Sequence, residues 1–219
     1  MINSVIEKHI LGQEAKRKNR VRSGKYNPSA FGQCYLRQFW NRKDKVVSDP
    51  ISLDVLKTFE LGKIIHTYVQ DKIEGKCEVE ISTDDCFGFA DVVTDTHVID
   101  IKTVNSRAWK FVQPKKDEDD TSYHQRMNED KVDNFLQCAF YADFLGKPYF
   151  QLSYINKDTF EVIELVRETN LWVNKVRNEL DVLRGYWTLD KEPPAMPRLY
   201  NGRECRYCQF RSVCDYGKK

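Results

Sequence analysis

The sequence predicts a mixed α/β domain in which helices flank a central sheet. Three observations favour this class. Runs rich in Val, Ile and Phe lie between segments of helical spacing, the 219 residues can bury one core, and the composition is that of a globular protein. Hydrophobic residues make up 41% and charged residues 31%, which excludes a disordered or fibrous chain. We therefore expect one domain over residues 1–219.

Two helices are predicted in the N-terminal part of the chain. Residues 27–40 are expected to form a turn and a short helix, with Ser29 as N-cap and Cys34 inside the helix. A longer helix is predicted from Asp49 to about Ile73, because an acid followed by proline is typical of a helix start. Its apolar stripe is expected to turn His66 toward the core. The stripe comprises Val55, Phe59, Gly62, His66, Val69 and Ile73.

The middle of the chain predicts three strands followed by a loop. Residues 77–82, 87–94 and 97–104 are rich in Val, Ile and Phe and are expected to form a meander. Residues 105–127 contain Pro114 and the acidic run 117–120. We expect this segment to be a long mobile loop.

Helices and strands alternate again in the second half. Helical spacing runs from Val132 to Phe144 and stops at the Gly-Lys-Pro of residues 146–148. Residues 149–155 and 160–166 predict a β-hairpin. A helix capped by Asn170 is expected next, and residues 192–197 form a stiff proline-containing linker. The buried face of that helix is expected to comprise Val173, Val176, Leu180, Leu183 and Trp187.

The net charge alone does not identify a partner. The formal charge is +2, but basic residues gather near both ends of the chain. They are expected either to form one phosphate-facing surface or to be two solvated flanks. They comprise Lys16, Arg17, Lys18, Arg20, Arg22, Lys25, Arg198, Arg203, Arg206, Arg211, Lys218 and Lys219. The sequence shows no bilayer-spanning run and no signal peptide, so we expect a cytoplasmic protein without membrane contact.

The segment from residue 88 to residue 102 predicts a metal site. If Asp95 and Thr96 form a two-residue turn, Asp91 stands directly opposite Asp100. These like charges repel, and a divalent cation with oxygen ligands, such as Mg or Mn, would reverse that repulsion and activate water. Lys102 leaves its strand on the face of Asp100 and can reach a scissile phosphate. The alternative is a hairpin of solvated acids with Lys102 as their ion-pair partner.

Four further residues are candidates for this site. His66 offers a nitrogen ligand from a helix face, although a core histidine is the alternative. Gln137 and Tyr141 are one turn apart on one helical face, which permits joint action or makes them a polar helix edge. Glu80, on the strand before Asp91, is a weaker candidate for supporting the site.

Four short motifs, in sequence order, resemble those of RecB-type PD-(D/E)XK nucleases: Gly62-x-x-x-His66, Gly88-x-x-Asp91, Asp100-Ile101-Lys102 and Gln137-x-x-x-Tyr141. The resemblance implies a restriction-endonuclease-like core. It also implies that a metal ion is held by His66, Asp91, Asp100 and the main-chain carbonyl of Ile101. Lys102 would then assist hydrolysis, and Gln137 and Tyr141 would contact substrate.

The cysteines predict a second inorganic site. Seven cysteines without an export signal argue against disulfides and for metal-bound or catalytic thiols. Cys205, Cys208 and Cys214 need a fourth ligand, for which Cys34 is the best candidate. Four thiolates can hold zinc or an iron–sulfur cluster, and their spacing does not choose between these. The remaining three cysteines, expected to be small buried hydrophobic residues, are Cys77, Cys86 and Cys138.

One distant cysteine before a C-terminal trio resembles the CRISPR-associated exonucleases of the Cas-four family and the nuclease domains of AddB and Dna-two helicases. The resemblance implies a [4Fe–4S] cluster on the four cysteines, with zinc as the alternative. Such a cluster would join about residues 27–45 to residues 192–219 in one small subdomain and stabilise the fold.

The expected function is therefore that of a metal-dependent DNA exonuclease acting on single-stranded ends in CRISPR adaptation, recombination or repair. Endonuclease activity is also open. Aromatic residues near the basic N-terminal segment would stack on bases or belong to the core: they are Tyr26, Phe31, Tyr35, Phe39 and Trp40. The alternatives are a non-catalytic DNA-binding adaptor of a CRISPR-integration or recombination complex, and a zinc-containing nucleic-acid binder.

Overall fold

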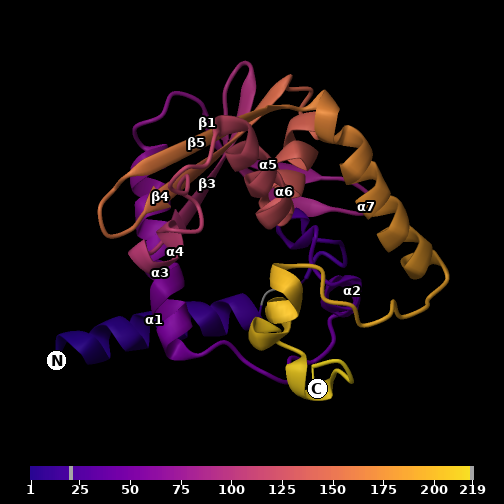
Figure 1. Ribbon diagram of the computed structural model, residues 1–219. Coiled ribbons are helices and arrows are strands. Elements are labelled where there is room, and N and C mark those ends of the chain that lie inside the picture. Colours follow the sequence, from indigo (N-terminus) through magenta and orange to yellow (C-terminus); the bar gives the residue numbers. More distant parts are fainter. Residues whose placement is uncertain (20–21, 218–219) are drawn as a thin grey trace.

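A five-stranded mixed sheet with the order β1-β2-β3-β4-β5 forms the centre of the computed structural model, which describes residues 1–19 and 22–217 (Figure 1). Strands β1 (Lys76–Ser82), β2 (Phe87–Val93) and β3 (His97–Val104) form the predicted antiparallel meander. Strand β4 (Tyr149–Asn156) runs parallel to β3, and β5 (Val162–Glu168) is antiparallel to β4. The parallel connection passes through helices, as parallel pairing requires.

Helices pack against both faces of the sheet. Helix α6 (Val132–Phe144), with α5 (Asp120–Asp130) and α7 (Asn170–Thr188), contributes to one large core that includes Phe135 and Phe150. Helix α3 (Leu53–Gln70) lies over the other face, where Ile65 packs with Ile99 and Ile101. The predicted α/β class, with a mixed sheet flanked by helices, is therefore confirmed.

The hairpin between β2 and β3 has the predicted register. Val92 pairs with Ile99 and Val93 with Val98. The backbone pairing ends at Val92. At the preceding residue, Asp91, the side chain replaces the main chain as hydrogen-bond acceptor, because Oδ2 accepts a hydrogen bond of 2.7 Å from the Ile101 amide. Asp91 thus lies beside β3 at Ile101, and its pairing opposite Asp100 stays a prediction.

Helix α3 begins later than predicted and exposes much of its predicted core stripe. Ser52 is its N-cap and accepts a hydrogen bond from the Val55 amide. Asp49 does not cap it, because that carboxylate accepts hydrogen bonds from the amide and hydroxyl of Ser212. The exposed fractions of Val55 and Phe59 are 38% and 51%, so the prediction that both belong to the core is wrong. The spacing of apolar residues along a helix does not show whether a face packs in the core or lines a groove.

Residues 105–127 are not the predicted mobile loop. Helix α4 (Ser106–Trp109) and the first part of α5 lie within them, and Trp109 and Tyr123 are buried. The acidic run has local structural roles. Asp119 caps α5 by accepting a hydrogen bond from the Ser122 amide, and Glu118 lies 2.7 Å from the Arg126 guanidinium.

The remaining boundaries differ by a few residues from the predictions. Helix α6 ends as predicted, with Gly146 at φ 64°. Thr169, rather than Asn170, is the N-cap of α7. Asn27, rather than Ser29, caps the 3-10 helix η1 (Pro28–Ala30), because its side chain accepts a hydrogen bond from the Ser29 amide.

A small third core joins the two ends of the chain. Helix α2 (Tyr35–Arg42) begins after Cys34, which is its N-cap and is not inside the helix. Its residues Phe39 and Trp40 pack with Phe210, which lies between the 3-10 helices η2 (Tyr200–Tyr207) and η3 (Arg211–Val213). The C-terminal segment lies near α2 in Figure 1. The extent of the cluster subdomain, about residues 27–45 and 192–219, stays a prediction.

Helix α1 (Ile2–Lys18) packs against α3, where Glu7 pairs with Lys57 at 2.7 Å. None of the helices in the described ranges is both long and apolar enough to cross a membrane.

Candidate functional site

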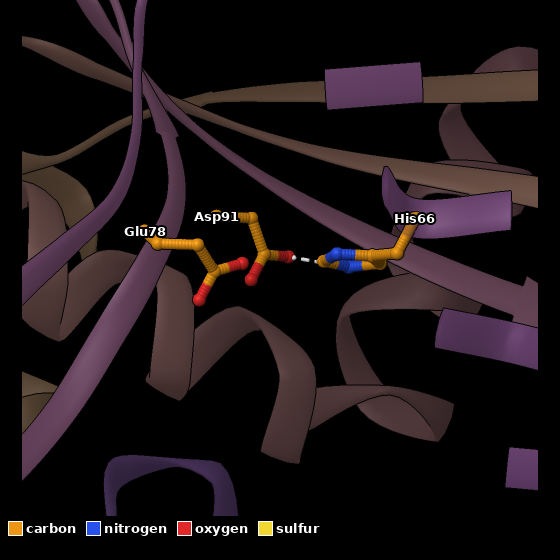
Figure 2. A group of neighbouring side chains, drawn as sticks. All are labelled: His66, Glu78 and Asp91. Carbon is orange, nitrogen blue, oxygen red and sulfur yellow. Dashed lines mark ion pairs between the residues drawn. The ribbon is translucent and has the colours of Figure 1, made fainter. Parts of the chain in front are cut away.

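Three of the predicted metal ligands lie around one point, and Figure 2 shows two of them, His66 and Asp91. His66 on α3 places Nε2 3.0 Å from Asp91 Oδ2 and 2.9 Å from the Ile101 carbonyl oxygen. A carbonyl only accepts, so Nε2 carries the proton in this arrangement. The helix, β2 and β3 thus bring together a nitrogen, a carboxylate oxygen and a main-chain oxygen.

Glu78 on β1 is a further member of this site that the sequence pattern did not reveal. Each of three residues offers a ligand atom that lies within 4.8 Å of the other two: His66, Glu78 and Asp91. Cys77 pairs with Val92 and Val79 with Ala90, so Glu78 faces Asp91 across the ladder. This register depends on the turn between β1 and β2, which the sequence pattern does not fix.

The supporting residue predicted from the sequence, Glu80, lies farther along the same strand. It pairs with Phe89 and is exposed. Glu80 is not a member of the three-residue group. Glu78, rather than Glu80, is therefore the acid of β1 that lies beside Asp91.

The backbone is irregular where Glu78 faces Asp91. Glu78 has φ 51°, which is unusual for a residue other than glycine. Ala90 and Val92 would share a face in a regular strand, but they pack in different cores. Gln70 Nε2 donates hydrogen bonds to Glu78 Oε1 at 2.7 Å and to the Asp91 carbonyl at 2.9 Å. The departure from strand geometry directs two carboxylates toward one point, as strained backbone at functional sites often does.

Lys102 connects the second predicted carboxylate to the predicted polar helix edge. Its ammonium donates hydrogen bonds to Asp100 Oδ1 at 3.2 Å and to Gln137 Oε1 at 2.9 Å. Nζ also lies 2.9 Å from Asp100 Oδ2, which accepts no hydrogen bond from the described residues. Asp100 is 1% exposed and lies outside the three-residue group within 4.8 Å.

The electrostatics of the site favour a cation. Burial raises the pKa of Asp100 to about 6, against the charge of Lys102, and Asp91 adds to the increase. Burial acts to lower the pKa of His66, but the hydrogen bond and charge of Asp91, with the Ile101 carbonyl, raise it above its usual value. Burial likewise acts to lower the pKa of Lys102, and the charges of Asp100 and Asp91 raise it. The burial that makes the charged form of Asp100 unfavourable is offset when a cation lies beside it.

The residues fit a hard divalent ion in their spacing as well as in their chemistry. Neighbouring ligands of an octahedral ion bound at about 2.1 Å lie about 3.0 Å apart. His66 Nε2 lies 3.0 Å from Asp91 Oδ2 and 2.9 Å from the Ile101 carbonyl. The proton on Nε2 therefore lies where an ion would bind, and ion binding would release it.

Two glycines of the predicted motifs are required for close approach. A Cβ on Gly62 would lie 2.9 Å from Thr103 Oγ1, because α3 packs closely on β3. A Cβ on Gly88 would lie 2.4 Å from the Tyr141 hydroxyl oxygen. Tyr141 is 2% exposed and Gln137 is 7% exposed. Their contacts therefore position Lys102 and β2, and their contact with substrate stays a prediction.

Replacing Gly88 with Ala is expected to destabilise the fold by about 1–3 kcal/mol, because the added methyl group overlaps the Tyr141 hydroxyl. Chemical unfolding measures the change. The double variant Gly88→Ala with Tyr141→Phe removes the hydroxyl and should recover part of the loss. Gly185→Ala is the matched control, since nothing lies within 4 Å of its added Cβ. Equal stability of the two alanine variants would contradict the assigned contact.

The four predicted cluster ligands line one cavity in the small third core. Cys34, Cys205, Cys208 and Cys214 all face it. The Glu204 carboxylate accepts a hydrogen bond of 3.1 Å from the Cys34 amide and another from the Leu199 amide. It thereby connects the N-terminal cysteine to the C-terminal segment.

Burial raises the pKa of Cys205, and Glu204 and the three neighbouring thiols add to it. Burial also raises the pKa of Cys208. The remaining cysteines lie elsewhere. Cys86 and Cys138 are buried as predicted. The prediction is wrong for Cys77, which is exposed near the start of β1, the first strand in the sheet order.

The aromatic residues considered for base stacking belong mainly to the core. Exposed fractions are 5% or less for Tyr26, Phe31, Phe39 and Trp40. Tyr35 is half-buried and donates a hydrogen bond to Glu179. The stacking interpretation is therefore wrong for the four buried rings, and the core alternative holds.

The basic flanks are only partly described. Arg22 pairs with Asp44 at 2.7 Å, and Arg198 pairs with the buried Glu179 at 2.8 Å. The described part of the chain does not include Arg20, Lys218, Lys219 or the side chain of Lys18. A common phosphate-facing surface stays a prediction.

The comparisons with known proteins bear on the fold. No protein-family model matches the sequence, and no curated protein matches it. The crystal structure of SSO0001 is 18% identical with a TM-score of 0.62, over 98% of this chain and 96% of that chain. An alkaline exonuclease (LHK-Exo) from Laribacter hongkongensis is 12% identical with a TM-score of 0.48, over 77% of this chain and 90% of that chain.

The crystal structure of LHK-Exo in complex with dAMP is 13% identical with a TM-score of 0.47, over 76% of this chain and 89% of that chain. The similarity to SSO0001 supports the mixed α/β fold over nearly the whole length.

Proposed function

We propose that the protein is a divalent-metal-dependent nuclease that hydrolyses DNA, chiefly at single-stranded ends. One observation carries the proposal: the His66 imidazole, the Asp91 carboxylate and the Ile101 carbonyl have the spacing of neighbouring metal ligands. A lysine lies beside these ligands, held by the buried Asp100. Acidic ligands with a cation beside them suit phosphodiester hydrolysis.

Five groups would hold the ion. Three are the His66, Asp91 and Ile101 atoms described above. Glu78 adds a second carboxylate from β1. The resemblance also implies Asp100 as a ligand, although it lies outside the three-residue group and its Oδ2 pairs with Lys102 at 2.9 Å. When bound, Mn or Mg would supply an activated water and offset negative charge on the phosphate.

Lys102 would act on the phosphate directly. Asp100 and Gln137 hold its ammonium in place, and Asp100 with Asp91 keeps it protonated. A fixed ammonium can donate to a phosphate oxygen or to the attacking water, so it stabilises the charge that develops during hydrolysis. Tyr141 supports this arrangement by its packing on Gly88.

Glu78→Gln is expected to weaken Mn binding by about 10- to 100-fold, because it removes a charged oxygen and keeps the side-chain shape. Isothermal titration calorimetry measures the affinity. Glu80→Gln is the matched control, since this acid is on the same strand and outside the three-residue group. If both variants bind Mn as the unaltered protein does, Glu78 is not a ligand.

For the cysteines we propose a [4Fe–4S] cluster, with zinc as the alternative. Four thiols line one cavity, which supports a shared inorganic group. Four thiolates can hold either group, and the resemblance of the cysteine pattern to iron–sulfur nucleases supports the cluster.

The nuclease proposal is tested by incubating an end-labelled single strand and the matching duplex with the purified protein and Mn. We expect progressive shortening of the single strand, and no cleavage when EDTA removes the metal. Binding without any cleavage in Mn or Mg would contradict the proposal and favour the adaptor alternative. Endonuclease activity, a cytoplasmic location and a role beside CRISPR-integration or recombination proteins rest on the sequence alone.

A further inference from the structure

The proposed metal site opens into a groove with a volume of about 680 Å³. One wall is the outer face of α3, which contributes Phe59 and Lys63, and Lys157 also lines the groove, with its ammonium against α3. His66, Glu78 and Lys102 line the same groove. An occupant of the groove therefore lies directly against the groups proposed to hold the metal ion.

Phe59 presents a large apolar ring in this groove. It is 51% exposed, although burying a Phe side chain is usually favourable. About half of its surface is free to contact an occupant of the groove. Phe59 lies two helical turns before His66, about 10 Å along the axis of α3. A flat group stacked on the ring would be a close neighbour of the reacting centre.

Two lysines flank this ring. Lys63 follows Phe59 by one turn, and its pair with Glu60 at 3.1 Å is at the surface, where such pairs are weak. Lys157 is held in place, because its ammonium donates a hydrogen bond of 3.0 Å to the Thr58 carbonyl. Burial lowers the pKa of Lys157, against the charge of Asp158. Both ammonium groups complement an anion that enters the groove.

We propose that this groove binds an unpaired segment of a nucleic-acid strand, with a base stacked on Phe59 and phosphates held by Lys63 and Lys157. The inference rests on the proposed nuclease function and adds the feature that selects the substrate. An unpaired base has a free face for stacking, whereas a base inside a duplex is already stacked on its neighbours. The combination of an exposed ring with cations is that of single-strand binding surfaces.

The same helix provides a matched control. Tyr68 is 56% exposed and lies nine residues after Phe59, about half a turn around the helix. Its ring packs against Phe160, with centroids 5.8 Å apart, and it does not line the groove. Phe59→Ala and Tyr68→Ala thus remove similarly exposed rings from opposite sides of α3.

The experiment measures binding of a labelled poly-dT strand by fluorescence anisotropy in Ca²⁺. All variants carry Lys102→Met, so that the strand is bound but not cleaved. Phe59→Ala should weaken binding by about 5- to 150-fold, the loss expected for one stacked base. Phe59→Tyr should retain it. Tyr68→Ala should bind as its parent does. A labelled duplex should show no difference between Phe59→Ala and its parent.

Equal affinities of Phe59→Ala and Tyr68→Ala for the single strand would overturn the proposal, as would absence of single-strand binding by the parent. Equal losses for strand and duplex would overturn the selection of unpaired bases. A specific loss in Phe59→Ala from a protein that never cleaves DNA would support the groove and contradict the nuclease function. The two proposals therefore fail in distinguishable ways.

Discussion

Replacing Lys102 with Met is expected to reduce DNA cleavage by about 10²- to 10⁴-fold, because it removes the ammonium that faces the phosphate. The substitution keeps most of the apolar stem of the side chain. Mn binding should persist, since Lys102 is not a proposed ligand. Single-turnover cleavage measures the first effect, and calorimetric titration with Mn measures the second.

Loss of the ion pair with Asp100 also lowers stability, because removing one partner of a buried pair costs about 3–5 kcal/mol. The double variant Lys102→Met with Asp100→Asn removes both charges and tests stability alone, because Asp100 is also a proposed metal ligand. It should resist chemical unfolding better than Lys102→Met does. Lys72→Met is the matched control for the loss of one lysine, because Lys72 lies near Tyr68 and outside the groove. Full activity of folded Lys102→Met would contradict the assigned role.

Cys208→Ala is expected to abolish binding of the proposed cluster and to detach the C-terminal segment. Cys208 packs in the third core with Phe210 and lines the cavity shared by four thiols. A structural metal site contributes on the order of 10 kcal/mol, so its loss should lower the melting temperature strongly. Iron analysis, visible absorption and limited proteolysis of residues 192–217 measure the three consequences.

Cys77→Ala is the matched control for Cys208→Ala, because Cys77 is exposed on β1 and outside the cavity. It should keep iron, colour and stability. Equal iron content in both variants would contradict the cysteine assignment. Stoichiometric zinc in a colourless protein would replace the iron–sulfur proposal with its alternative and leave the four ligands unchanged.

The parts of the site that the sequence predicted are those fixed by short-range geometry. The two-residue turn at Asp95 and Thr96 determines the register of β2 and β3, and this register brings Asp91 beside Ile101. Lys102 reaches Asp100 because residues two apart share a strand face. The position of His66 in the site depends on the close packing of α3 on β3, which Gly62 permits.

The parts that the sequence did not predict depend on long-range contacts. Glu78 could be found only with the register of β1 and β2 and with its unusual backbone angle. Asp49 resembled a helix cap, but Ser212 from the far end of the chain binds it instead. Phe59 resembled a core residue, because periodicity does not distinguish a buried face from a groove. Each error arose where tertiary structure overrode a local pattern.

Anomalous diffraction from crystals soaked in Mn²⁺ would locate the proposed ion and identify its ligands. We expect one strong peak bonded to His66 Nε2, Asp91 Oδ2 and the Ile101 carbonyl oxygen, with Glu78 and Asp100 beside it. A well-diffracting crystal with no peak there, while His66 still donates its proton to the Ile101 carbonyl, would contradict the metal site and the nuclease function that depends on it.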